Sequence, residues 1–491
     1  MAPLAGADTP VFVVGDDDQS IYGWRGARIE NIHHFERDFA NTEVVRLEQN
    51  YRSTGTILKA ANALIDNNNS RLGKELWTES DDGEPILFYS AYNEKDEARF
   101  VIDRIESWVA QGRDRKDVAV LYRSNAQSRQ FEETLVTRGM PYRVYGGLRF
   151  FERAEIKDAL AYMRMISSPT ADNAFERTVN HPPRGIGQKT IDEVRNHARA
   201  QSASLWNASV DLVGSDQLSA RARGALQAYL DLIQRLTTEL DGMSLGEQIR
   251  CAIEISGLEA HFKKDNTEKG QSRIENLQEL VGAGKGFEHD AAIEENMSTL
   301  DAFLAHAALE AGEGQADAWE DCVQLMTMHS VKGLEFPLVF LVGMEEGLFP
   351  HQRSSEEPGR MEEERRLCYV GITRAREQLV VTSAEVRRLY GGESYNMLSR
   401  FVREIPSELM QEIRPRANFS RPVIPASPQI GQDRVKEDTG LSVGQRVNHA
   451  RFGDGIVLNL EGQGPQSRVQ VNFEEVGSKW LIASMANLQP A

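Results

Sequence analysis

The string GDDDQSIYGWRGA, from Gly15 to Ala27, combines residue types suited to chemistry on phosphates and bases. Its carboxylates and glutamine amide suit phosphates and Mg²⁺, and ligands of open parallel sheets lie where strands end. It continues with Tyr22, Trp24 and Arg25. Aromatic rings stack on nucleobases for roughly 1–3 kcal/mol each. A plain strand-to-helix turn with a partly buried Trp is the alternative, and composition alone leaves both open.

The octapeptide LEQNYRST, from Leu47 to Thr54, places an aromatic ring beside an arginine. Tyr51 is suited to stack on a nucleobase, while Arg52 brings positive charge to a phosphate. Alternatively, Arg52 is solvated and Ser53 or Thr54 caps the helix that follows.

A third string, TMHSVKGLEFPLVFLVG from Thr327 to Gly343, runs from a strand through a polar loop into a second strand. Its hydroxyl, imidazole and N–H groups suit a nucleic-acid phosphate, and the carboxylate of Glu335 suits a ribose hydroxyl. Taken alone, His329 is more often a structural residue.

The fourth string, EEERRLCYVGITRARE from Glu362 to Glu377, predicts a helix with Arg374 near its end. Its four arginines suit a phosphate site. They are equally interpreted as surface arginines that pair with Glu362–Glu364, as opposite charges on one helix face do.

Strands and helices must position these strings. Short apolar runs that end in polar residues predict buried strands at VFVV (Val11–Val14) and VVRL (Val44–Leu47). Further strands are predicted at ILFY, VAVLY, VQLMT, LVFLVG and QLVVTS, with amphipathic helices around Ile57–Ile65 and Phe100–Trp108. This alternation predicts an α/β fold with a parallel sheet.

Two other stretches differ from this pattern. Residues 151–321 show long amphipathic helices, which predicts a mainly helical block inserted into one α/β domain. Five of the 17 prolines lie between Pro406 and Pro428, in a stretch that predicts a flexible linker. Short alternating strands with Gly-rich turns then predict a small barrel of about 50 residues.

Composition sets further bounds. The chain has 491 residues, with 56 Lys plus Arg and 74 Asp plus Glu, for a net charge of −18. A negative charge spread evenly over the surface would argue against a nucleic-acid partner. This charge is not spread evenly, because ten acidic residues and no Lys or Arg lie between Gly286 and Val331. Three separated cysteines predict neither a disulfide framework nor a cysteine zinc site. No run approaches the roughly 18 apolar residues of a membrane span, so we expect a cytoplasmic protein with no membrane partner.

Together, the four strings resemble the UvrD/Rep/PcrA family of superfamily 1 DNA helicases, in the family's order and over nearly the whole chain. The resemblance implies an α/β fold with a RecA-like parallel-sheet motor domain, a mainly helical inserted domain, a fragment of a first RecA-like domain and a small C-terminal β-barrel (Tudor-like). The implied boundaries are 1–47 for the first-domain remnant, 48–150 and 322–404 for the second motor domain, 151–321 for the insertion, 405–441 for the linker and 442–491 for the barrel.

The resemblance also implies site residues and cofactors. ATP and Mg²⁺ are the implied cofactors, although no residue is assigned as a metal ligand. The residues implied for ATP are Gln19 as γ-phosphate sensor, Arg52 and Arg374 as arginine fingers, Asp16 on the metal and water side, Tyr51 on adenine and Glu335 on the ribose. Those implied for single-stranded DNA are Tyr22, Trp24, Arg25 and His329.

Two shorter strings also match family features. RGIGQKT, from Arg184, is similar to a hairpin that grips duplex backbone before a helix, which implies contacts from Arg184, Gly185 and Gly187. A plain helix start is the alternative. RRLYGGESY is similar to a hairpin that wedges the duplex apart, with Tyr390 at its tip, and an ordinary β-hairpin is the alternative.

The P-loop pattern GxxxxGK[ST], which holds the β- and γ-phosphates, does not occur in the sequence, nor does the acidic strand-end motif that the family carries upstream of GDDDQ. Two hypotheses follow. The chain is an ATP-dependent 3′-to-5′ DNA helicase of DNA repair, which unwinds duplex DNA by translocation on single strands. Alternatively, it is an N-terminally truncated fragment that binds DNA or docks partners without ATPase activity of its own. A helicase–nuclease fusion is disfavoured, because no distinct nuclease domain or metal cluster follows Arg374.

The implied partners are single-stranded and duplex DNA. For the barrel they are RNA polymerase or proteins of nucleotide-excision and mismatch repair, in the nucleoid of a bacterial cytoplasm. Charges in the barrel cancel, which favours a protein partner over a DNA backbone. The residues concerned are Arg446, Arg451, Arg468 and Lys479 against Asp454, Glu461, Glu474 and Glu475.

Overall fold

The computed structural model describes residues 11–23, 26–39, 42–69, 71–290, 297–312, 316, 320–355, 359–389, 392–413, 446–449, 452–461, 468–473, 477–482, 486 and 488–490. The chain forms two compact units, Met1–Pro415 and Arg416–Ala491. Most of the predicted linker lies outside the described residues. None of the described helices has the length and hydrophobicity that a bilayer crossing requires.

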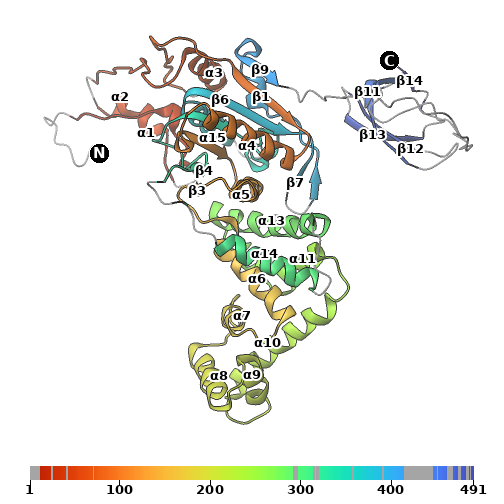
Figure 1. Cartoon of the computed structure of the whole chain (residues 1–491). Coiled ribbons are helices and arrows are strands. Elements are labelled where there is room, and N and C mark those ends of the chain that lie inside the picture. The colour runs from red at the N-terminus through yellow and green to blue at the C-terminus, as the bar shows by residue number, and fades with distance from the viewer. Residues whose placement is uncertain are drawn as a thin grey trace, which may run out of the picture. The chain divides into compact units, whose positions relative to one another are not determined.

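The first unit is built on a seven-stranded sheet in the order β3-β4-β2-β5-β6-β1-β9, with every neighbouring pair parallel (Figure 1). Its strands are β1 (Ile86–Ala91), β2 (Val118–Tyr122), β3 (Tyr142–Val144), β4 (Val323–Thr327), β5 (Phe336–Leu341), β6 (Ala375–Ala384) and β9 (Met410–Ile413). Five of them contain the apolar runs that predicted strands, so the parallel α/β fold is confirmed.

Helices cover both faces of this sheet. Along β2, Ala119 and Leu121 belong to one apolar cluster and Val118 and Val120 to another, because successive side chains of a strand point to opposite faces. The helices that complete the clusters are α3 (Gly55–Ile65) and α15 (Arg360–Ile372) on the first face, and α4 (Glu94–Ala110) and α5 (Ser128–Thr137) on the second. All of β2 is therefore buried, as a central parallel strand must be.

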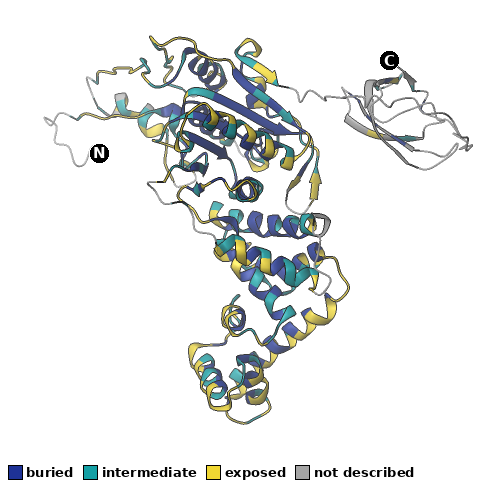
Figure 2. Cartoon of the chain, in the orientation of Figure 1, coloured by how far each residue is buried: buried dark blue, intermediate teal, exposed yellow. Residues whose placement is uncertain are grey.

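The two buried strands predicted at Val11–Val14 and Val44–Leu47 are wrong. In the part of the chain that the structure describes, neither segment pairs with another strand. Phe12 is 92% and Leu47 79% exposed (Figure 2). An apolar run becomes a buried strand only where neighbouring strands and covering helices exist, and these two segments have neither. Short helical turns lie between them, namely η1 (Asp17–Gln19), α1 (Glu30–His33) and α2 (Phe35–Asp38).

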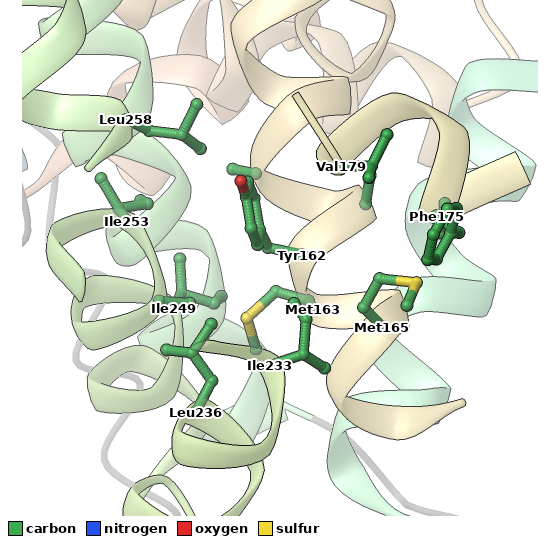
Figure 3. Close-up of a cluster of buried hydrophobic side chains, with 14 of the residues drawn as sticks. Tyr162, Met163, Met165, Phe175, Val179, Ile233, Leu236, Ile249, Ile253 and Leu258 are labelled. Atoms are coloured by element: carbon green, nitrogen blue, oxygen red, sulfur yellow. The ribbon is translucent and has the colours of Figure 1, made fainter. Parts of the chain in front are cut away.

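Helices fill the chain between β3 and β4. They are α6 (Ala154–Ser167), α7 (Asp172–Thr178), α8 (Gln188–Gln201), α9 (Leu205–Val213), α10 (Ala220–Glu239), α11 (Leu245–Ile255), α12 (Leu258–Phe262), α13 (Glu268–Asp290) and α14 (Thr299–Gly312). One apolar cluster forms their core, with Tyr162 packed near Ile249 and Ile253 (Figure 3). The Tyr162 hydroxyl is buried there and donates to the His181 carbonyl at 2.6 Å, so the phenol remains satisfied. The predicted helical insertion is confirmed.

Helix α13 joins the insertion to the sheet-bearing part through buried polar side chains. Ser124 donates to Glu275 at 2.5 Å, and Arg129 donates to Glu279 at 2.7 Å. Burial raises the pKa of Glu279 to about 7, although the Arg129 charge opposes that rise. This joint therefore depends on matched charges and hydrogen bonds.

A hairpin of β7 (Arg387–Leu389) and β8 (Gly392–Ser394) follows β6, as RRLYGGESY predicts. Tyr390, the predicted tip residue, lies outside the described residues. At the base of the hairpin, the buried Arg387 guanidinium donates to Glu97 at 2.6 Å and to Glu345 at 2.5 Å. A buried cation between two buried carboxylates thus fixes the hairpin to the sheet.

The second unit is a five-stranded antiparallel sheet in the order β13-β12-β11-β10-β14. Its strands are β10 (Arg446–His449), β11 (Gly453–Glu461), β12 (Arg468–Phe473), β13 (Gly477–Ile482) and β14 (Gln489–Pro490). Val447, Val469, Val471 and Phe473 form a small apolar core.

We expect Arg387→Met to destabilise the first unit by about 3–5 kcal/mol, because it leaves two buried carboxylates without their cation. Equilibrium urea unfolding followed by circular dichroism measures this loss. The matched control is Arg388→Met in the same hairpin, where the Arg388–Glu393 pair is solvent-exposed and worth about 0–1 kcal/mol. Equal losses from the two variants would contradict the anchoring role of Arg387.

Candidate functional site

Arg52, Glu335 and Arg374 lie together at the amino ends of β5 and β6. Glu335 directly precedes β5 and Arg374 directly precedes β6, and the Phe336 N–H donates to the Arg374 carbonyl at 3.0 Å. The segment with Arg52 runs alongside, because the Ser53 hydroxyl donates to the Ala375 carbonyl at 2.6 Å. Arg52 Nε then donates to Glu335 Oε2 at 2.5 Å. Strand pairing thus brings together residues that lie far apart in the sequence.

The electrostatics of this cluster favour an anion. Arg374 is 2% exposed and donates to the carbonyls of Val370 and Leu334 and to the Thr373 hydroxyl. Burial, together with the Arg52 charge, lowers the pKa of its guanidinium to about 10. Among the described residues, no carboxylate forms an ion pair with Arg374. The hydrogen bond from Arg52 lowers the pKa of Glu335, so this carboxylate is charged and already occupied.

Tyr51 lies beside this cluster with its ring open to solvent. It is 84% exposed, and its hydroxyl donates to Gln49 Oε1 at 2.8 Å. A large aromatic face that the chain leaves uncovered is free to stack on a flat ligand. Arginine charge and an open ring therefore fit the phosphates and base of a nucleotide such as ATP.

The acidic turn at Asp16–Asp18 is held by cations and by a backbone N–H. Lys74 contacts Asp16, Arg71 donates to both oxygens of Asp18 at 2.9 and 3.0 Å, and the Leu72 N–H donates to Asp17. Carboxylate oxygens of the three residues lie within 4.8 Å of one another, a spacing that suits a metal ion. In this arrangement, however, their oxygens already bind protein groups, so the turn does not fit Mg²⁺.

Residues predicted for DNA lie on the adjoining loop. The Tyr22 hydroxyl donates to the His329 carbonyl at 3.4 Å, and Lys332 Nζ lies 5.2 Å from the centre of the Tyr22 ring. Lys332 also donates to the Gln19 carbonyl at 2.9 Å. The structure thus brings Gln19, Tyr22 and His329 together. Trp24 and Arg25 lie outside the described residues.

In the insertion, Arg184 faces inward. Its guanidinium donates to the carbonyls of Thr178, Pro182 and Ser256 and lies over the Tyr162 ring. Beyond it, Gly185 has a φ of +79°, and a side chain there or at Gly187 would enter open space. There is room for a phosphate beside the two glycines, but the N–H groups of Arg184 and Ile186 already donate to Asn180 at 2.8 and 3.2 Å. The Arg184 side chain supports the loop from within.

Most arginines of the fourth string are buried, so their interpretation as surface residues is wrong for Arg365, Arg366 and Arg374. Arg365 pairs with Glu404 at 2.7 Å, and Arg366 donates to the Ser20 carbonyl at 3.0 Å. They hold α15 against neighbouring segments of the chain. Arg366 also lies 3.8 Å from Glu362, so the predicted pairing with this glutamate is present although the arginine is buried.

Sequence reasoning missed Arg71, Lys74 and Lys332 as members of this site. All three bind the loop at Asp16–Tyr22. The available signal was charge complementarity, because a triple acid needs cations when it is buried and the string RLGK offers two. Nothing local in the sequence shows that these two segments meet.

Comparison with known proteins identifies the family. A model of the UvrD-like helicase C-terminal domain matches residues 45–386, one of the UvrD/REP helicase N-terminal domain matches residues 1–40, and one of the PcrA/UvrD tudor domain matches residues 443–489. The chain belongs to the UvrD/PcrA family of DNA helicases. The resemblance inferred from the four strings is thereby confirmed, as is the Tudor-like character of the second unit.

Relatives within the UvrD/PcrA family are close. DNA helicase II of Escherichia coli is 56% identical over 486 residues, which cover 99% of this chain and 67% of that protein. The ATP-dependent DNA helicase PcrA of Bacillus subtilis is 41% identical over 502 residues, which cover 97% of this chain and 66% of that protein. The chain therefore spans about two thirds of the length of these relatives. A solved C-terminal domain of a possible DNA helicase from Lactobacillus has a TM-score of only 0.26 at 10% identity, covering 74% of this chain and 98% of that one.

We expect Glu335→Gln to tighten binding of pyrophosphate by roughly 5-fold, because one negative charge about 4 Å away that water screens fully is worth about 1 kcal/mol, and the Glu335 side chain is 43% exposed. Isothermal titration calorimetry measures the change. Glu377→Gln is the matched control, since it removes a carboxylate of similar exposure from the Arg113–Glu377 pair. Unchanged or weaker pyrophosphate binding by Glu335→Gln would show that this cluster is not an anion site.

Proposed function

We propose that this helicase-family chain supplies one wall of an ATP site and a path for single-stranded DNA in a motor that moves 3′-to-5′. The observation that carries the proposal is the buried Arg374, which forms no ion pair with any described carboxylate and lies beside Arg52 and the open Tyr51 ring. Such a cluster stabilises the negative charge that phosphoryl transfer develops. The family resemblance supports the direction of movement and a role in DNA repair.

Each residue contributes by binding or orienting. Tyr51 would stack on the base, and Glu335 would accept from a ribose hydroxyl once Arg52 turns to a phosphate. Arg374 would provide fixed positive charge at the γ-phosphate, because its three protein hydrogen bonds hold the guanidinium in place. Gln19 would donate to the same phosphate. ATP would supply the phosphoanhydride bond whose hydrolysis drives movement.

A second candidate function is DNA binding or partner docking without hydrolysis. The observation that favours it is the lack of a GxxxxGK[ST] pattern in the printed sequence. Arginines alone position charge, whereas turnover also needs a lysine and backbone N–H groups on the β- and γ-phosphates. We therefore propose that the chain contributes to hydrolysis but does not perform it alone.

The Tudor-like unit is proposed to dock a protein. Support comes from the tudor domain match and from the balanced charges of the barrel sequence. RNA polymerase and proteins of nucleotide-excision or mismatch repair are the proposed partners, on the basis of the family resemblance. Single-stranded and duplex DNA are the proposed partners of the first unit.

The purified chain is expected to release phosphate from ATP only at the background rate, with or without single-stranded DNA, because it lacks the P-loop groups. A coupled phosphate-release assay checks this. Arg374→Ala is the control for contaminating ATPases and should give the same background. DNA-stimulated turnover that Arg374→Ala abolishes would contradict the second candidate and support an active enzyme.

Trp24→Ala should weaken binding of an oligo-dT strand by roughly 5- to 100-fold, because one stacked ring contributes about 1–3 kcal/mol. The slope of log Kd against log salt should stay unchanged, since a ring neutralises no phosphate. Arg25→Gln, the neighbouring control, should instead lower that slope by about 0.7. Fluorescence anisotropy between about 50 and 200 mM salt separates the two effects. If neither variant altered binding, this loop would not hold DNA.

A further inference from the structure

Two segments that belong to different family domains meet at the acidic turn. Asp16–Gln19 lies within the match to the helicase N-terminal domain, whereas Arg71 and Lys74 lie within the match to the C-terminal domain. The side chain of Arg71 is 11% exposed and that of Asp18 is 1% exposed, and the guanidinium donates to both carboxylate oxygens. Two parallel hydrogen bonds of this kind fix geometry as well as charge.

Lys74 makes the second contact and reaches further into the site. Its ammonium group contacts Asp16 Oδ1, and the other oxygen of that carboxylate, Oδ2, accepts from Gln19 Nε2 at 2.7 Å. Lys74 is largely buried, with 16% of its side chain exposed. A continuous chain of contacts therefore runs from Lys74 through Asp16 to the amide of Gln19.

The hydrogen-bonding groups of the Gln19 amide explain why its contact with Asp16 matters. A glutamine amide carries two N–H donors and one acceptor oxygen. Asp16 takes one N–H, which fixes the rotation of the amide and leaves the second N–H for another acceptor. Asp16 Oδ1 also accepts from the Asp18 N–H at 3.1 Å. Without Lys74, this single hydrogen bond would hold the carboxylate, and the Gln19 amide would have a less firmly fixed partner.

We propose that Lys74 and Arg71 are positioning residues that set the orientation of the Gln19 amide from across the domain boundary. Arg71 anchors the turn through Asp18, and Lys74 holds the carboxylate that orients Gln19. That the oriented Gln19 amide senses a phosphate rests on the proposed function. The orientation of the amide itself requires no nucleotide.

Selective ¹⁵N-glutamine labelling of the whole chain tests this in the absence of nucleotide. The side-chain NH₂ signal of Gln19 is identified by its loss in Gln19→Glu. The two protons of any glutamine NH₂ group differ in shift, because rotation about the amide C–N bond is slow. We therefore expect the proton bonded to Asp16 to be displaced from its position in a solvent-exposed glutamine and to exchange slowly with water. Lys74→Met should shift that proton towards the solvent-exposed position and speed its exchange, whereas Lys74→Arg, which keeps the charge, should leave both unchanged.

Three controls keep the test decisive. Lys59→Met removes an exposed lysine from its pair with Asp82 and should leave the Gln19 signal unchanged. Gln378 Nε2 donates to Glu84 at 2.8 Å. The side-chain NH₂ signal of Gln378 is therefore an internal reference, whose shift only a general loss of structure would change. If Lys74→Met moves that reference, Lys74→Gln repeats the test with a polar side chain of similar length.

A Gln19 signal that stays unchanged in Lys74→Met or Lys74→Gln would overturn the proposal, as would an equal change in Lys59→Met. A lower thermal midpoint with an unchanged Gln19 signal would show that Lys74 has only a structural role. Because no nucleotide is added, a positive result together with failed pyrophosphate binding would count against the proposed function and leave the positioning role intact.

Discussion

The candidate site depends on the buried guanidinium of Arg374, which forms an ion pair with none of the described carboxylates. Placing a charge in a protein interior is costly unless it is paired or hydrogen-bonded, and the depressed pKa of Arg374 reflects that cost. Two carbonyls and one hydroxyl partly offset it. The pairing of β5 with β6 forces this arrangement, because the residues that precede the two strands must then lie side by side.

Other buried arginines of the first unit show the contrast. Arg387 lies between two carboxylates and Arg365 pairs with Glu404, and in both the neighbouring negative charge compensates the cation. Paired charges of this kind fix a hairpin or a helix. Arg374 forms no ion pair with a carboxylate in the part of the chain that the structure describes, so its position, more than its residue type, marks the candidate cluster.

The sequence predicted the sheet well because its central strands are short apolar runs covered on both faces, as β2 is. It failed for Val11–Val14 and Val44–Leu47, where the same apolar signal is present but no partner strand is described. The grouping of Arg52, Glu335 and Arg374 followed from family resemblance, whereas strand pairing explains it physically. The contacts of Lys74 could not be predicted, because they join residues 58 positions apart through side chains alone.

Gln19 and Tyr22 are separated by three positions, and one lysine contacts both. Lys332 donates to the Gln19 carbonyl and lies over the Tyr22 ring, and its own segment carries His329 before it and Glu335 after it. Gln19, proposed to contact a phosphate, and Tyr22, proposed to contact DNA, thus share one lysine and are joined by a short stretch of backbone. With Asp16 and Asp18 held by Lys74 and Arg71, the loop has fixed contacts at its acidic end and at its aromatic end. Short rigid connections of this kind are what a motor requires if a change at a phosphate is to displace a nucleic-acid strand.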